Sequence, residues 1–200
     1  MNKILKLFFI ISLNLLFADQ EAYQKVTGYH YNDVWKSMND FSLDIRYDIG
    51  EDKVYIYIPE FIHTVAYELD KEDRQKLITI LEKYFEWQNK AIEMEVELEK
   101  NIDDVVLKGY FKLGDDWRSS CKKSCLIRLS FFSQNTTRHQ LVFSFGKINA
   151  CYNEYSDHKP DQVYMDYNDA VILKSALTQE KLQSVINEVE KKKSIEDAFK

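Results

Sequence analysis

The residues with the most distinctive chemistry are three cysteines, all in the second half of the chain: Cys121, Cys125 and Cys151. They predict one disulfide and one free thiol, because a structural zinc site needs a fourth ligand that no Cys or His supplies at the usual spacing. Two arrangements stay open. In the first, Cys151 is bonded to either Cys121 or Cys125. In the second, Cys121 and Cys125 close a small loop and Cys151 is free. A hairpin that turns at Thr136 and Thr137 brings Cys151 opposite residue 122, beside Cys121 and within reach of Cys125, which slightly favours the bond to Cys121.

The histidines, acidic residues and glycines form no recognisable catalytic or cofactor motif. His30, His63, His139 and His158 include no pair with zinc-type spacing. The segment Asp166–Asp169 lacks the glycine and distant glutamate of a calcium loop, so we interpret it as a turn. The five glycines are scattered, which excludes a dinucleotide fingerprint and a P-loop. We therefore predict no catalytic residue, no metal site and no cofactor.

One segment is basic although the chain as a whole is acidic. From Tyr110 to Arg138, Lys and Arg outnumber Asp and Glu by six to two. Aromatic residues lie in the same segment, and this combination is suited to an acidic protein or a glycan partner. The favoured interpretation is an ordinary solvated strand face, because charges are common on half-buried strands. The candidate partner patch comprises Trp117, Arg118, Lys122, Lys123, Arg128 and Arg138.

The secondary structure that must position these residues is predicted most clearly for residues 41–99. Apolar and polar residues alternate over 41–48, which predicts a half-buried strand. The β-branched and aromatic run 54–58 predicts a second strand, antiparallel to the first. The short apolar stretch 64–69 predicts a third strand. Asp70 is a predicted N-cap, and apolar residues three or four apart predict one long amphipathic helix over 71–99.

The second half repeats this order of strands before a helix. We predict that Thr178 caps a shorter amphipathic helix. Strands grouped before helices indicate an α+β fold with a mostly antiparallel sheet, one long helix and one shorter helix. The predicted strands are 105–113, 126–133, 140–148, 163–165 and 170–173.

The two predicted helices begin with similar sequences, Leu69–Lys83 and Leu177–Lys191. We interpret residues 19–200 as a single α+β domain. One hypothesis, which we do not favour, is that 41–99 and 105–192 are two similar β-then-α units. The alternative is that capped amphipathic helices resemble one another whatever their origin.

The first 18 residues have the order of a secretory signal peptide. Lys3 and Lys6 are followed by the apolar run Leu7–Phe17, and polar sequence begins directly after Ala18. The alternative is an uncleaved membrane anchor, but 11 residues are too few to cross about 30 Å of hydrocarbon as a helix. We expect cleavage and no transmembrane segment in the remaining chain.

Removal of this segment takes away two lysines and no acid, so the formal charge changes from −6 to −8. An acidic chain is a poor partner for nucleic acid, whose phosphates are bound by Lys and Arg. We predict an exported protein of the bacterial periplasm or extracellular space that works by binding a protein or glycan. Two alternatives are an enzyme with scattered catalytic groups, which the lack of motifs disfavours, and a structural part of an envelope assembly.

Overall fold

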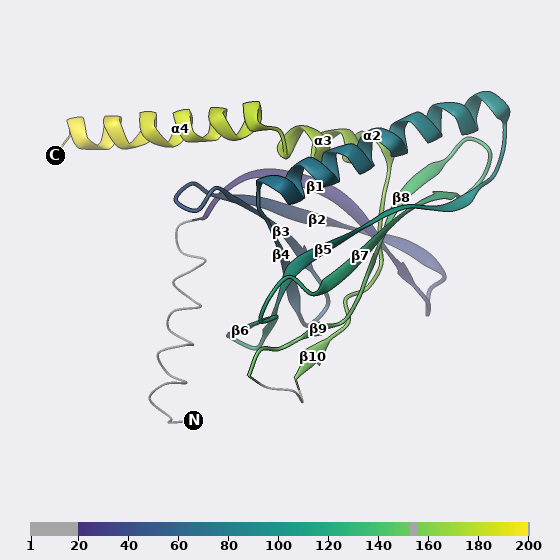
Figure 1. The fold of residues 1–200 in the computed structure, drawn as a ribbon, viewed down its shortest axis with the longest axis horizontal. Helices are drawn as coiled ribbons and strands as arrows, with labels where there is room; N and C mark the ends of the chain where they lie inside the picture. The colour runs from purple at the N-terminus through teal and green to yellow at the C-terminus, as the bar shows by residue number, and fades with distance from the viewer. Residues whose placement is uncertain (1–19, 153–155, 200) are drawn as a thin grey trace.

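The computed structural model describes residues 20–152 and 156–199, and the predicted signal peptide lies outside them. The described residues form an α+β fold, as predicted, with a large antiparallel sheet and three helices (Figure 1). The strands of this sheet are β1 (Gln20–Asn32), β2 (Ser37–Asp48), β3 (Lys53–Pro59), β4 (Thr64–Leu69), β5 (Glu99–Leu113), β6 (Asp116–Ser119), β7 (Cys125–Ser133), β8 (His139–Phe145) and β11 (Val163–Met165).

The sheet closes on itself. Its strand order is β4-β3-β2-β1-β11-β8-β7-β5-β6, and β4 also pairs with β5. The long strand β5 makes this closure, because its first part pairs with β7 and its last part pairs with β4 and β6. The seam between β1 and β11 is short, with Tyr29 opposite Tyr164. Two short strands, β9 (Ile148–Asn149) and β10 (Asp157–His158), pair separately.

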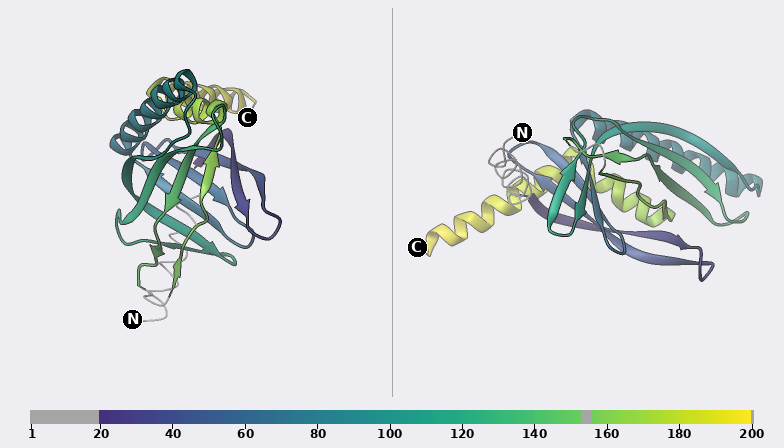
Figure 2. Two further views of the ribbon diagram at one scale, coloured as in Figure 1. Left: turned by 90° about the vertical axis from the view of Figure 1, so that its right-hand side faces the viewer. Right: turned by 90° about the horizontal axis from the view of Figure 1, so that it is seen from below.

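The closed sheet has two different ends. Helices α2 (Lys71–Met94) and α3 (Tyr167–Ala176) lie across one end, which we call the helix end (Figure 1). Four strand connections lie on the side of the sheet away from these helices, which we call the loop end: β1–β2, β3–β4, β5–β6 and β8–β11. The β1–β2 hairpin projects to one side of the other three (Figure 1). The third helix, α4 (Gln179–Ala198), extends away from the sheet, and its second half is exposed (Figure 2).

The long helix α2 begins where the sequence predicts and ends earlier. Asp70 accepts from the Asp73 backbone N–H, and the Asp73 carboxylate accepts from the Asp70 N–H, which completes a capping box. At the other end Glu95 adopts a left-handed conformation, with φ 53°, and stops the helix. The predicted extension to residue 99 is therefore wrong, and Met94 and Leu98 are exposed instead of joining the core.

The interior of the sheet is filled with apolar side chains. Inward-facing strand residues pack against Leu77, Leu81 and Tyr84 of α2 and Leu173 of α3. The cavity they leave measures about 20 Å³ and exposes no polar surface. That volume is close to the space of one water molecule, so this cavity has no room for a small-molecule ligand.

Three further predictions differ from the structure. Residues 170–173, predicted as a strand, lie in α3, and the predicted turn Asp166–Asp169 is the start of that helix. Strand β1 was not predicted at all. The Thr178 cap is confirmed, since its side chain accepts from the Lys181 N–H. One sheet combines strands of both proposed β-then-α units, and their common origin stays a hypothesis.

Candidate functional site at the loop end

The cysteines adopt the favoured pairing. Cys121 and Cys151 form a disulfide with Cα atoms 4.7 Å apart, and Cys125 is a buried free thiol. The β7–β8 hairpin has Ser133 opposite His139, close to the predicted register. A Cβ on residue 109 would lie 2.6 Å from the Cys125 sulfur, so glycine is required there. Burial raises the pKa of the Cys125 thiol, which disfavours the reactive thiolate.

Each of the four connections at the loop end exposes a large apolar side chain. Phe61 and Ile62 stand on the β3–β4 turn, where Phe61 is fully exposed and Ile62 is 71% exposed. Trp35, 78% exposed, and its neighbour Val34 form the β1–β2 turn. The other two connections expose Leu113, beside the β5–β6 turn, and Tyr152, after β9. We call these six residues the apolar tips: Val34, Trp35, Phe61, Ile62, Leu113 and Tyr152.

A buried carboxylate anchors the β3–β4 turn to the rest of the molecule. The Glu60 side chain is only 6% exposed, although Phe61 beside it is fully exposed. One oxygen of Glu60 lies 2.5 Å from His158 Nε2, and the other accepts from the Asp161 N–H at 2.8 Å. These contacts join the turn to the β8–β11 connection, 98 residues away in the chain. The Phe61–Ile62 turn is therefore anchored.

His63 connects the same turn to β5. Its Nδ1 lies 3.1 Å from the Lys112 carbonyl oxygen, and its ring meets the His158 ring edge-on at 4.6 Å. Strand pairing of Thr64 with Lys112 brings Leu113 beside the turn. Sequence reasoning treated His63 and His158 as isolated, because only the closure of the sheet brings them together. In the described residues no group of His, Cys, Asp or Glu could hold a metal ion.

The predicted basic patch is spread over several elements. Trp117 and Arg118 are neighbours on β6 and therefore point to opposite faces of the sheet. Trp117 contacts Tyr57 edge-on at 5.8 Å, and Arg118 donates to the Ser156 hydroxyl. Arg128 lies 3.4 Å from Asp104 across the β5–β7 pair. The six residues thus do not share one face.

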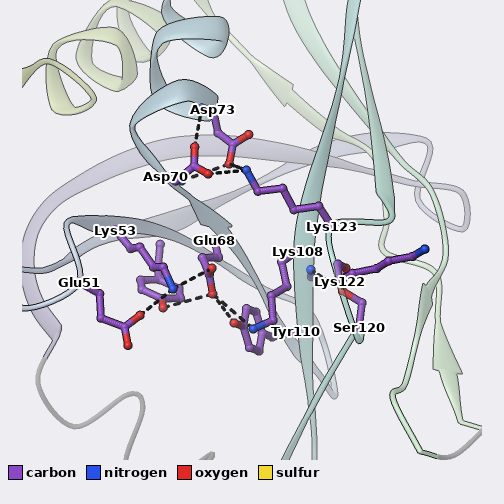
Figure 3. Close-up of polar contacts among 12 residues, drawn as sticks. Glu51, Lys53, Glu68, Asp70, Asp73, Lys108, Tyr110, Ser120, Lys122 and Lys123 are labelled. Atoms are coloured by element: carbon purple, nitrogen blue, oxygen red, sulfur yellow. Dashed lines mark hydrogen bonds and ion pairs between the residues drawn. The ribbon is translucent and has the colours of Figure 1, made fainter.

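Most of the charge in that patch is already paired. Lys123 Nζ lies 2.5 Å from Asp70 and 2.7 Å from Asp73, at the start of α2 (Figure 3). Arg138 lies 3.0 Å from Asp166 at the start of α3. Lys122 points away from the acids in the same view, so its charge faces solvent.

A second polar cluster lies on the outer side of β3, β4 and β5, around Glu68 (Figure 3). Glu68 accepts from the Tyr110 hydroxyl and lies 3.1 Å from Lys53 and 3.7 Å from Lys108. Burial raises the pKa of Glu68, but the Tyr110 hydrogen bond and the two ammonium groups outweigh it and lower that pKa. The carboxylate is held ionised and surrounded by donors, which suits cross-strand stabilisation better than proton transfer.

One serine–histidine pair resembles part of a hydrolase site. Ser133 Oγ lies 2.8 Å from His139 Nδ1 and accepts from the Leu98 N–H. His139 is 2% exposed, its Nε2 has no partner in the described residues, and burial lowers its pKa. A catalytic histidine needs a second group to orient it and access to a substrate, and this one has neither in the part that the structure describes. We interpret the pair as a clamp across the β7–β8 hairpin.

Comparison with protein-family models, with curated proteins and with solved structures finds no match to this chain. Within the described part of the chain, no helix has both the length and the apolar character needed to cross a membrane. The argument for function therefore depends on the loop end itself.

Proposed function

We propose that the protein is an exported binding protein that docks on its partner through the apolar tips at the loop end. The observation that carries the proposal is that exposed Trp35, Phe61, Leu113 and Tyr152 lie on or directly beside four separate connections at one end. Single exposed apolar residues are ordinary on protein surfaces, whereas a set gathered at one end is typical of an interaction site.

The anchoring of the β3–β4 turn supports the proposal. A side chain held in place before binding loses little conformational entropy when it docks. Glu60 supplies this anchoring through a buried carboxylate. A buried carboxylate is tolerated only where it is well paired, as Glu60 is.

Two further observations favour binding over catalysis and export over a cytosolic role. The filled interior leaves the outside of the molecule as the place for recognition. The Cys121–Cys151 disulfide is suited to an oxidising compartment such as the periplasm or the extracellular space. The basic patch stays a separate hypothesis, now with most of its charges in ion pairs.

The test is capture of an envelope partner by the immobilised exported chain. We expect the double variant Phe61→Ser, Ile62→Ser to lose capture. The matched control is Val106→Ser with Leu126→Ser, an exposed apolar pair opposite each other on β5 and β7. Equal capture by wild type and both double variants would contradict docking through the tips.

A further inference from the structure

We infer that the partner of the apolar tips is a lipid–water interface with neutral headgroups. This inference depends on the proposed docking function and names its partner. Three properties of the loop end carry it: its convex shape, its charge balance and its residue types.

The loop end presents its apolar side chains on separate projections. The tips stand on separate turns, and the β1–β2 hairpin reaches beyond its neighbours, because β2 residues 37–43 continue past the last pairing of β2 with β3 at Asp44. A protein partner would need a matching pocket for each projection, since well-packed interface cores depend on shape complementarity. A lipid interface deforms around each side chain separately and needs no such match.

The charges at this end favour neutral headgroups over anionic ones. In none of the four connections do Lys and Arg outnumber Asp and Glu. Lys36 lies 3.7 Å from Asp33, and Lys147 lies 2.9 Å from Asp157, so each of these ammonium groups has an acidic neighbour. Binding to anionic lipids depends on free basic residues near the surface, and this end offers no excess of them.

The residue types fit the depth of an interface. Trp and Tyr are favoured at the level of the headgroups, where one side of the ring is apolar and the other is hydrated. Trp35 and Tyr152 are residues of this kind, and Val34, Phe61, Ile62 and Leu113 add fully apolar side chains. Burial of such side chains is favourable in proportion to their apolar area.

The experiment is flotation of the exported chain with phosphatidylcholine vesicles, compared with vesicles that also contain phosphatidylglycerol. We expect binding to both kinds that does not weaken at high salt. The variant Phe61→Ser, Ile62→Ser should bind about tenfold or more weakly, and the Val106→Ser, Leu126→Ser control should bind as wild type does. Lipids brominated on their acyl chains should quench tryptophan emission, and that quenching should disappear in Trp35→Phe.

Each other outcome overturns the inference in an identifiable way. Binding that needs phosphatidylglycerol and is lost at high salt would show an electrostatic mechanism. Absence of vesicle binding, with tip-dependent capture of an envelope protein, would replace the lipid by a protein and leave the docking function intact. Absence of both would remove the docking function as well.

Discussion

The two ends of the closed sheet treat apolar residues in opposite ways. At the helix end, Leu77, Leu81 and Tyr84 of α2 are buried against the inward-facing strand residues. At the loop end, Phe61 and Trp35 project into solvent from turns. The same kind of side chain therefore stabilises the fold at one end and is available for contact at the other.

This difference separates stability from recognition. Buried side chains at the helix end contribute transfer and packing free energy that is lost when they are truncated. Exposed tips contribute almost nothing to the folded state, so the proposed docking function predicts that their substitution changes binding and leaves folding unchanged. The predictions below test that separation, beginning with the largest effect.

Leu81→Ala should lower the free energy of unfolding by about 2–5 kcal/mol, because Leu81 has no exposed surface and the cavity left behind cannot be filled by water. Phe61→Ala, at a fully exposed position, should change it by less than about 0.5 kcal/mol. Urea unfolding followed by circular dichroism measures both. Similar losses in the two variants would show that the loop end is also part of the packed core.

Removal of the disulfide by Cys121→Ser with Cys151→Ser should lower the free energy of unfolding by about 3 kcal/mol in the chain-entropy model, for a sequence separation of 30 residues. Non-reducing peptide mapping should find Cys121 bonded to Cys151 and Cys125 alkylated only after unfolding. A mapped bond to Cys125, or three free thiols, would contradict the described pairing.

Local sequence pattern predicts the elements whose signals are short-range. The Asp70 cap and the alternation of residues 41–48 depend on neighbours a few positions away, and both are present in the structure. The end of α2 was misjudged because Met94 and Leu98 continue the helical spacing of apolar residues after Glu95 has already stopped the helix. The short apolar run 170–173 fits a strand and a helix equally by periodicity.

The candidate site depends on contacts that no local pattern contains. Glu60 and His158 meet only because β4 pairs with β5 and the β8–β11 connection returns to the same end. Two sequence signals did exist: the apolar pairs Val34-Trp35 and Phe61-Ile62 lie among polar turn residues, where apolar pairs are unusual.

Asp70→Ala should lower the free energy of unfolding by about 1 kcal/mol at neutral pH, through loss of the helix cap. Burial raises the pKa of Asp70, but the Lys123 ammonium and the Asp73 N–H outweigh it and bring that pKa to about 2. The unfolded value is about 3.9, so this contribution is complete above pH 4 and is lost as the pH falls through 2. The difference in the free energy of unfolding between wild type and variant should therefore decrease from pH 4 to pH 2, and acid unfolding measurements can follow it.

Thr178→Ala is the matched control for this pH dependence, because the Thr178 hydroxyl caps α4 and does not titrate. Its effect on the free energy of unfolding should be similar in size and constant between pH 4 and pH 2. A constant difference for Asp70→Ala as well would show that the Asp70 carboxylate is not held ionised by Lys123.

The smallest expected effect separates two adjacent lysines of the basic patch. Lys123→Glu puts a negative charge beside Asp70 and Asp73 and should lower the free energy of unfolding by about 0.5 kcal/mol, a modest loss because the side chain is 42% exposed and screened by solvent. Lys122→Glu should change it by less than about 0.3 kcal/mol, since that side chain points into solvent (Figure 3). Thermal unfolding at low and high salt measures both, and the difference between the variants should narrow at high salt.

Partner capture provides the decisive second readout, because docking through the apolar tips predicts that Lys122→Glu has no effect on it. Weaker capture by Lys122→Glu at unchanged stability would instead place recognition on the basic patch.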